Sequence, residues 1–249
     1  MFPFRDHNPS QRTPYVTIAL IAVNVIVFLM MLPAYSDPFT MGMVLSEYAL
    51  FPVRISEGSG FYTLLTSAFM HGGFMHLAGN MLFLWVFGDN LEDQMGHGPF
   101  ALFYAAAAVL AGLAQVMSDP QSIVPMVGAS GAVAGVMGGY LLLFPKARVD
   151  VFFFFVIFFR IFPIPAWIVL GVWFALQLFN GTSVGAMDGG VAYWAHAGGF
   201  IAGLVMTIPV WIASGGKQFW VRAHGHTPHP EAKYRLSQSN IPIVRRKRR

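Results

Sequence analysis

The stretch MVGASGAVAGVMGGY, residues 126–140, is apolar yet consists mainly of glycine, alanine and valine. Ser130 lies where the small residues are most crowded, and Gly131, Gly135 and Gly139 repeat every four positions. Rows of small residues at this spacing let two membrane helices approach closely. The stretch therefore predicts a membrane helix that packs tightly on a partner and places one hydroxyl at the contact.

The composition of the 249-residue chain predicts a protein embedded in lipid. Hydrophobic residues make up 56% of it and charged residues 10%, whereas a soluble domain carries about 25% charged residues. Apolar segments near the roughly 20 residues that cross a bilayer lie at about 15–33, 74–94, 98–117, 127–144, 162–179 and 192–213. The predicted fold class is all-α, a polytopic membrane protein with six transmembrane helices.

The basic residues predict the orientation of these helices. Thirteen of the 15 lysines and arginines fall on one side of a six-span layout. They are Arg5 and Arg12, then Lys146 and Arg148, then Lys217, Arg222, Lys233, Arg235, Arg245, Arg246, Lys247, Arg248 and Arg249. Positive charge collects on the cytoplasmic side of membrane proteins, so we expect both termini there.

Three regions follow from this layout: a cytoplasmic tail at 1–14, a membrane domain at 15–213 and a basic cytoplasmic tail at 214–249. The first segment is too long for a signal peptide and lacks a good cleavage site, so we expect it to be retained. An extracytoplasmic loop at 34–73, rich in aromatic residues and methionine, is expected to form a partly embedded cap. Residues 149–161 are expected to lead into the fifth helix or to lie at the membrane interface. The tail ends in RRKRR, which favours anionic lipid over nucleic acid, because no nucleic-acid-binding fold is visible.

Four polar residues inside the apolar segments are functional candidates, because such groups are costly in lipid. They are Ser130, His196, His76 and Asn80. His76 and Asn80 are four residues apart, so they share one face of a helix.

His196 lies in a second row of small residues, with Gly199 and Gly203 on nearly its face. A lone serine in a membrane helix more often bonds to its own backbone. Two glycine rows, however, would bring the serine helix against the histidine helix, so that the imidazole reaches the hydroxyl.

This pair predicts nucleophilic catalysis. A serine hydroxyl needs a base to take its proton, and neutral histidine can do so and return the proton to a leaving amine. The backbone N–H of Ser130, at a helix start after Gly128, and the side chains of His76 and Asn80 are candidate oxyanion donors. No acidic residue lies near His196 in the last three segments, and Asp188 in the preceding loop is a remote candidate, so we predict a dyad. A metal site of His71, His76 and His196 is an alternative that the five-residue spacing of the first two does not favour.

Three motifs resemble one family. GASG (128–131), AHAGGFIAG (195–203) and HGGFMHLAGN (71–80) closely resemble those of the rhomboid intramembrane serine proteases, and the six-span layout resembles their basic bacterial form. The resemblance implies Ser130 as nucleophile, His196 as base, and oxyanion stabilisation by His76, Asn80 and the Ser130 backbone. It also implies that Gly128 and Gly131 shape the turn, that glycines such as Gly135, Gly199 and Gly203 pack the fourth helix on the sixth, and that the site opens to the extracytoplasmic face.

Two positions depart from that pattern. Rhomboids often carry a Trp-Arg pair in the first loop, where this chain has Tyr62 and Thr63. Many also have an aromatic residue four positions after the nucleophile, stacked on the catalytic histidine, where this chain has Ala134. We therefore expect another group to hold the imidazole, or the imidazole to be held less firmly.

The predicted function is intramembrane serine endopeptidase activity on transmembrane protein substrates, without metal or cofactor, in the inner (plasma) membrane. Substrate segments should contain small or helix-breaking residues, because a regular helix hides its scissile carbonyls. The family resemblance and a Phe-rich, Pro-interrupted stretch, residues 152–165, favour substrate access past the fifth segment. The main alternative is an inactive rhomboid-like protein that binds membrane clients, and a transporter is disfavoured because neither paired charges nor repeats occur.

Overall fold

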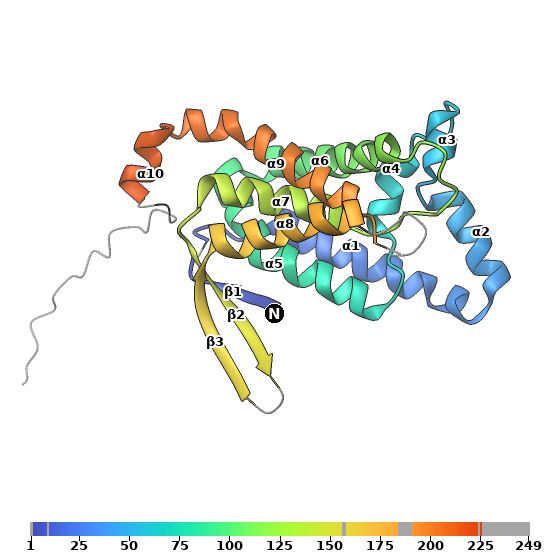
Figure 1. Cartoon of the computed structure of the whole chain (residues 1–249), viewed down its shortest axis with the longest axis horizontal. Helices are drawn as coiled ribbons and strands as arrows, with labels where there is room; N and C mark the ends of the chain where they lie inside the picture. Colours follow the sequence, from blue (N-terminus) through green and yellow to red (C-terminus); the bar gives the residue numbers. More distant parts are fainter. Residues whose placement is uncertain (1, 9, 156–157, 184–190, 224, 226–249) are drawn as a thin grey trace, which may run out of the picture.

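The computed structural model describes residues 2–8, 10–155, 158–183, 191–223 and 225, and it is mainly helical (Figure 1). Its elements, with η for a 3₁₀ helix, are β1 (Phe2–Asp6), α1 (Tyr15–Met31), η1 (Leu32–Ser36), α2 (Pro38–Tyr48), α3 (Pro52–Ser56), α4 (Thr63–Thr66), η2 (Ser67–Phe69), α5 (Phe74–Met95), α6 (His97–Ser118), α7 (Ser130–Leu143), β2 (Arg148–Phe155), β3 (Phe158–Pro165), α8 (Ala166–Ser183), α9 (Tyr193–Ala213) and α10 (Lys217–Ala223). The six predicted apolar segments correspond to α1, α5, α6, α7, α8 and α9.

Within the described residues, four helices are long and apolar enough to cross a membrane: Tyr15–Ser36, His97–Ser118, Ala166–Ser183 and Tyr193–Ala213. Of the other two, α7 has 14 residues, and α5 carries acidic side chains near its end. The chain is therefore a multi-pass membrane protein, and the count of six crossings stays a prediction.

Helix α7 lies at the centre of the bundle and contacts α5, α6, α8 and α9. Ten of its 14 residues are buried, which is possible because most of them are glycine, alanine or valine. At its far end the larger side chain of Tyr140 packs edge-on against Phe87 and Phe144. The small residues near Ser130 therefore allow close helix contact, while aromatic rings fill the other end.

The expectation of an all-α fold is wrong in one region. Residues Arg148–Phe155 and Phe158–Pro165 form an antiparallel hairpin, and β1 completes a three-stranded sheet in the order β1-β2-β3. Aromatic and β-branched residues favour strands, and the prolines in this stretch exclude a helix interior, so α8 begins only at Ala166. Figure 1 shows the hairpin projecting from one end of the bundle.

The N-terminal segment and the end of α5 form a polar cluster beside the sheet. The buried Glu92 carboxylate accepts N–H groups from Val16 (2.8 Å) and Thr17 (2.7 Å), and so caps α1. Asp6 accepts the hydroxyl of Tyr140 at 2.9 Å. Burial, with the nearby Asp89 carboxylate, raises the pKa of Asp6 to about 7, so a proton on Asp6 stabilises this end of the bundle.

The predicted cap at 34–73 consists of α2, α3, α4, η1 and η2 and lies over the opposite end of the bundle (Figure 1). Leu50 and Leu64 pack with Val116 at the end of α6. Backbone hydrogen bonds join Leu50 and Met126 in both directions, at 3.1 and 2.8 Å. These contacts fix the chain that leads into α7 and thereby set the position of its first turn.

Candidate active site

Ser130 is the first residue of α7, and the turn before it is held by backbone contacts. Gly128 has φ +131°, a region that side chains rarely adopt, and its N–H donates to the carbonyl of Ser67 at 2.9 Å. The Ser130 Oγ lies 2.7 Å from Nε2 of His196 on α9. The structure thus places the predicted nucleophile and the predicted base within hydrogen-bond distance.

The two glycine rows lie against each other, as their spacing predicts. A Cβ at Gly199 would collide with the carbonyl of Gly131, and one at Gly203 would collide with the backbone of Gly135. Helices α7 and α9 therefore approach so closely that no side chain fits between them. This approach brings the first turn of α7 to His196.

His196 is held from α8 by two residues that the sequence reasoning missed. Its Nδ1 lies 2.8 Å from Oε1 of Gln177, and the ring of Trp173 lies 5.8 Å from its own, centroid to centroid, at 36°. Ala134, at the position where many rhomboids carry an aromatic residue, is fully buried. The imidazole is thus supported from α8 instead. A polar side chain within the apolar fifth segment was the signal for Gln177.

His76 and Gly128 lie in direct contact. Nδ1 of His76 accepts the Gly72 N–H at 3.3 Å, and a Cβ at Gly128 would lie 2.7 and 2.8 Å from Cε1 and Nε2 of the same ring. Only glycine leaves room for this edge of the imidazole, which faces the turn before Ser130. Because Nδ1 accepts, Nε2 carries the hydrogen of the neutral ring and faces the turn as a donor.

Asn80 and His71 both contact His76. Asn80 is buried, and its side chain donates to the backbone carbonyl of His76 at 3.1 Å. This hydrogen bond lies within its own helix, α5. His71 packs edge-on against His76, with ring centroids 5.1 Å apart. Burial, with the neighbouring His76, lowers the pKa of His71 to about 4. In the part of the chain that the structure describes, no three His, Asp or Glu side chains form a group that could hold a metal ion.

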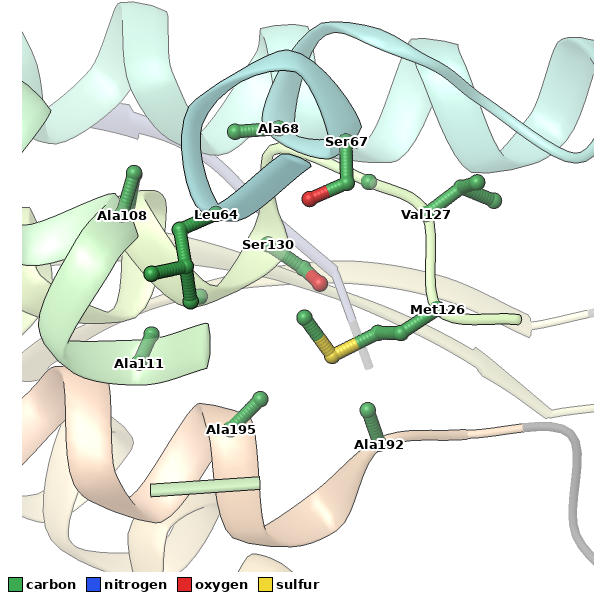
Figure 2. Close-up of a pocket in the computed structure, with 13 residues that line it drawn as sticks. Leu64, Ser67, Ala68, Ala108, Ala111, Met126, Val127, Ser130, Ala192 and Ala195 are labelled. Carbon is green, nitrogen blue, oxygen red and sulfur yellow. The ribbon is translucent and has the colours of Figure 1, made fainter. Parts of the chain in front are cut away.

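Two cavities meet at Ser130. A cleft of about 400 Å³ is lined by His76, Gln115, Ser130 and His196, among others. A second cavity, of about 10 Å³, lies between Leu64, Ser67, Met126 and Ala195, and Figure 2 shows the Ser130 hydroxyl directed into it. The smaller volume accommodates about one water molecule. The Ser130 hydroxyl can therefore be reached from the larger cleft while the helices around it stay packed.

The cap replaces the missing Trp-Arg pair with other contacts. Tyr62 donates its hydroxyl to the carbonyl of Glu47 at 2.9 Å, and the Thr63 hydroxyl donates to the Gly60 carbonyl at 2.7 Å. The Arg54 guanidinium donates to the carbonyl of Ser46. These bonds tie α2, α3 and α4 together near the cleft.

Comparison with known proteins identifies the family. The Rhomboid domain model matches residues 58–213. The chain is 32% identical over 149 residues to Rhomboid protein 1, mitochondrial, of Saccharomyces cerevisiae, in a match covering 57% of this chain and 40% of that protein. It is 30% identical over 131 residues to the putative rhomboid protease YdcA of Bacillus subtilis, covering 52% and 62%, and 39% identical over 87 residues to the rhomboid protease GluP of the same species, covering 35% and 16%. Each match thus spans less than two thirds of the relative. The chain belongs to the rhomboid family.

Proposed function

We propose that this protein is an intramembrane serine endopeptidase that hydrolyses peptide bonds in or next to transmembrane segments of its substrates. The observation that carries the proposal is the 2.7 Å contact between Ser130 Oγ and His196 Nε2, in a multi-pass membrane protein. Two of the relatives that match are named as proteases, one of them putatively.

The reaction begins with Ser130. His196 Nε2 takes the hydroxyl proton while Oγ bonds to the scissile carbonyl carbon, which gives a tetrahedral oxyanion. As this intermediate collapses, the imidazolium gives the proton to the leaving amine, and the carbon–nitrogen bond breaks. Water then attacks the acyl-enzyme with His196 again as base, which releases the acid and restores Ser130.

The oxyanion is stabilised at the first turn of α7. The backbone N–H of Ser130 has no partner within its own helix, as at any helix start. Nε2–H of His76 supplies a side-chain donor, because its Nδ1 accepts from Gly72. Asn80, which donates to the His76 carbonyl, supports the donor in its helix, and we keep it as a second candidate donor. Donors placed where charge develops are commonly worth about 10²–10³-fold in rate each.

The substrate is an extended segment of a transmembrane protein. The cleft of about 400 Å³ accommodates a few residues of extended chain and no helix, since a helix with side chains is about 10 Å wide. A regular helix also keeps its carbonyls bonded, so small or helix-breaking residues favour cleavage. We propose that the substrate arrives past α8, which has the smallest buried share of the four candidate membrane spans, at 17%.

The proposed topology has six crossings, through α1, α5, α6, α7, α8 and α9, in the inner (plasma) membrane. Both tails, 1–14 and 214–249, are cytoplasmic, and the cap at 34–73 is extracytoplasmic. The basic residues beyond 225 lie outside the described residues. The lipid bilayer and transmembrane substrates are the proposed partners, with no nucleic acid.

The test uses purified protein in liposomes with a reporter transmembrane substrate. Ser130→Ala and His196→Ala should each abolish cleavage, and a chelator should leave the wild type unchanged. Ser46→Ala is the matched control, because its exposed hydroxyl donates to the Met43 carbonyl of its own helix. Cleavage that survives Ser130→Ala, or that stops with chelator, refutes the proposal. Wild-type protein that binds the substrate without cutting it supports the inactive client-binding alternative.

A further inference from the structure

Gln177 on α8 contacts the side of His196 that faces away from Ser130. Its Oε1 lies 2.8 Å from Nδ1 of the imidazole, while Nε2 of the same ring contacts the Ser130 hydroxyl at 2.7 Å. The Gln177 side chain is 9% exposed. The three side chains thus form a continuous chain of hydrogen bonds across α8, α9 and α7.

The orientation of the Gln177 amide is fixed by a second contact. Its Nε2 donates to the backbone carbonyl of Trp173 at 3.3 Å. The reversed amide would set its oxygen against that carbonyl, so that two acceptors would face each other. The oxygen therefore points at His196, and only a protonated Nδ1 can donate to it. Nε2 is then left without a hydrogen and can accept the proton of Ser130.

From this geometry we infer that Gln177 is the positioning residue of the dyad, holding His196 in the one neutral tautomer that can act as base toward Ser130. The inference rests on the proposed function for its catalytic consequence. In other serine hydrolases a buried carboxylate fixes the histidine tautomer, and its loss costs about 10⁴-fold. Here a neutral amide performs the orienting part of that role.

A neutral group suits this location. A carboxylate buried among apolar helices carries a large desolvation cost unless it is fully paired, whereas an amide needs only its two hydrogen bonds. Among the described residues, His76 is the titratable group close enough for its charge to act on His196. No carboxylate among these residues does so. Gln115, the other glutamine near the site, accepts the N–H of Ala195 at 3.2 Å and does not replace Gln177.

The origin of Gln177 in α8 has a consequence for substrate access. Only 17% of the apolar stretch of α8 is buried inside the protein, against 44% for α6. Both residues that support the His196 ring, Trp173 and Gln177, lie on α8. A movement of α8 away from α9 would therefore release the imidazole. On this inference, the tautomer that serves Ser130 is held only while α8 lies against α9, which links proton transfer to the position of α8.

The test has one readout that needs no activity. Protein labelled with ¹⁵N-histidine, with His196 identified by the loss of its signals in His196→Ala, reports the tautomer through its ring nitrogen shifts. The wild type should show a protonated Nδ1 and a bare Nε2 at neutral pH. Gln177→Leu should show a tautomer mixture, and the control Thr182→Val, which removes a hydroxyl that donates to the Leu178 and Phe179 carbonyls of α8, should match the wild type. An unchanged tautomer in Gln177→Leu overturns the inference whether or not the protein is a protease.

The kinetic readout tests the same inference through the reaction. Gln177→Leu should lower kcat about 10²-fold with little change in KM. Gln177→Glu keeps an acceptor toward Nδ1, although its second oxygen faces the Trp173 carbonyl, and its charge favours the imidazolium, so it should move the acidic limb of the pH–rate profile to higher pH. A role in packing alone predicts equal losses in both variants and no movement of the profile. Loss of cleavage in Ser130→Ala, measured beside them, reports separately on the proposed function.

Discussion

Gly199→Ala tests whether the glycine rows set the reactive distance. The added Cβ would collide with the carbonyl oxygen of Gly131, and it would lie 3.0 Å from the carbonyl carbon and 3.2 Å from the Cβ of Ala111. The two nearest of these atoms belong to the Gly131 backbone, so no flexible side chain can move aside to make room. Helix α9 must therefore shift away from α7 by roughly 1 Å to reach ordinary van der Waals contact.

This shift is large compared with the contact that it opens. The Ser130 Oγ to His196 Nε2 distance is 2.7 Å, and roughly 1 Å more exceeds the range of a hydrogen bond. A displacement of that size commonly costs about 10²-fold in rate, and overpacking costs about 1–3 kcal/mol of stability. We expect kcat to fall about 10²-fold in a variant that still folds.

The assay combines reporter cleavage in liposomes with the labelling rate of Ser130 by a serine-reactive fluorophosphonate. Gly171→Ala on α8 is the matched control, because among the described residues no atom outside the adjoining turns of α8 lies within 4 Å of its added Cβ. That change should leave both rates unchanged and raise stability slightly, by about 0.5–1 kcal/mol. Wild-type rates in Gly199→Ala would refute the reasoning, since the close approach of the helices would then not set the dyad geometry.

Three further changes test other parts of the structure. Gly128→Ala places a Cβ 2.7 Å from the His76 ring and should slow cleavage about 10²-fold, because the His76 oxyanion donor is displaced. A kcat equal to that of the wild type would contradict this prediction. Glu92→Ala removes the cap of α1 and should lower the free energy of unfolding by about 2–3 kcal/mol, read as a lower melting temperature in detergent. Asp6→Asn removes a carboxyl with a pKa of about 7, which folded protein protonates and unfolded chain does not above about pH 4. Wild-type stability should therefore fall as pH rises from about 4 to about 7, by up to about 1.4 kcal/mol per unit, and thermal unfolding of the variant should show a smaller fall.

The sequence predicts the helices well because lipid imposes a simple rule on them. A segment that crosses a membrane must bond its own backbone, so long apolar runs become helices, and glycine spacing shows which faces meet. The predicted contact between Ser130 and His196 depended on this spacing, and the two side chains do lie together. Their chemical roles stay a prediction, as do those of His76 and Asn80.

The hairpin and the position of Gln177 against His196 could not be predicted from these sequence patterns. Most residues in the sequence at 148–165 are apolar, without the alternation of polar and apolar residues that marks a strand, so composition alone cannot separate two short strands from the start of a helix. The residues that hold the sheet together are distant in sequence. For example, Nε2 of His7 lies 2.7 Å from Oδ1 of Asp150. Gln177 lies on a helix whose rotation about its own axis is set by packing, and no periodicity in the sequence shows which of its residues faces His196.

On the proposed function, the length of α7 accounts for a reaction below the membrane surface. Its 14 residues span about 21 Å at 1.5 Å per residue, short of the roughly 30 Å of hydrocarbon. On the proposed topology its C-terminal end, near the polar cluster around Asp6, lies at the cytoplasmic interface, so Ser130 lies about 9 Å below the opposite surface. On this topology the cleft of about 400 Å³, which Ser130 lines, is where we expect water to reach the proposed acyl-enzyme. A longer α7 would carry the nucleophile to the surface, away from the membrane segments that we propose it cuts.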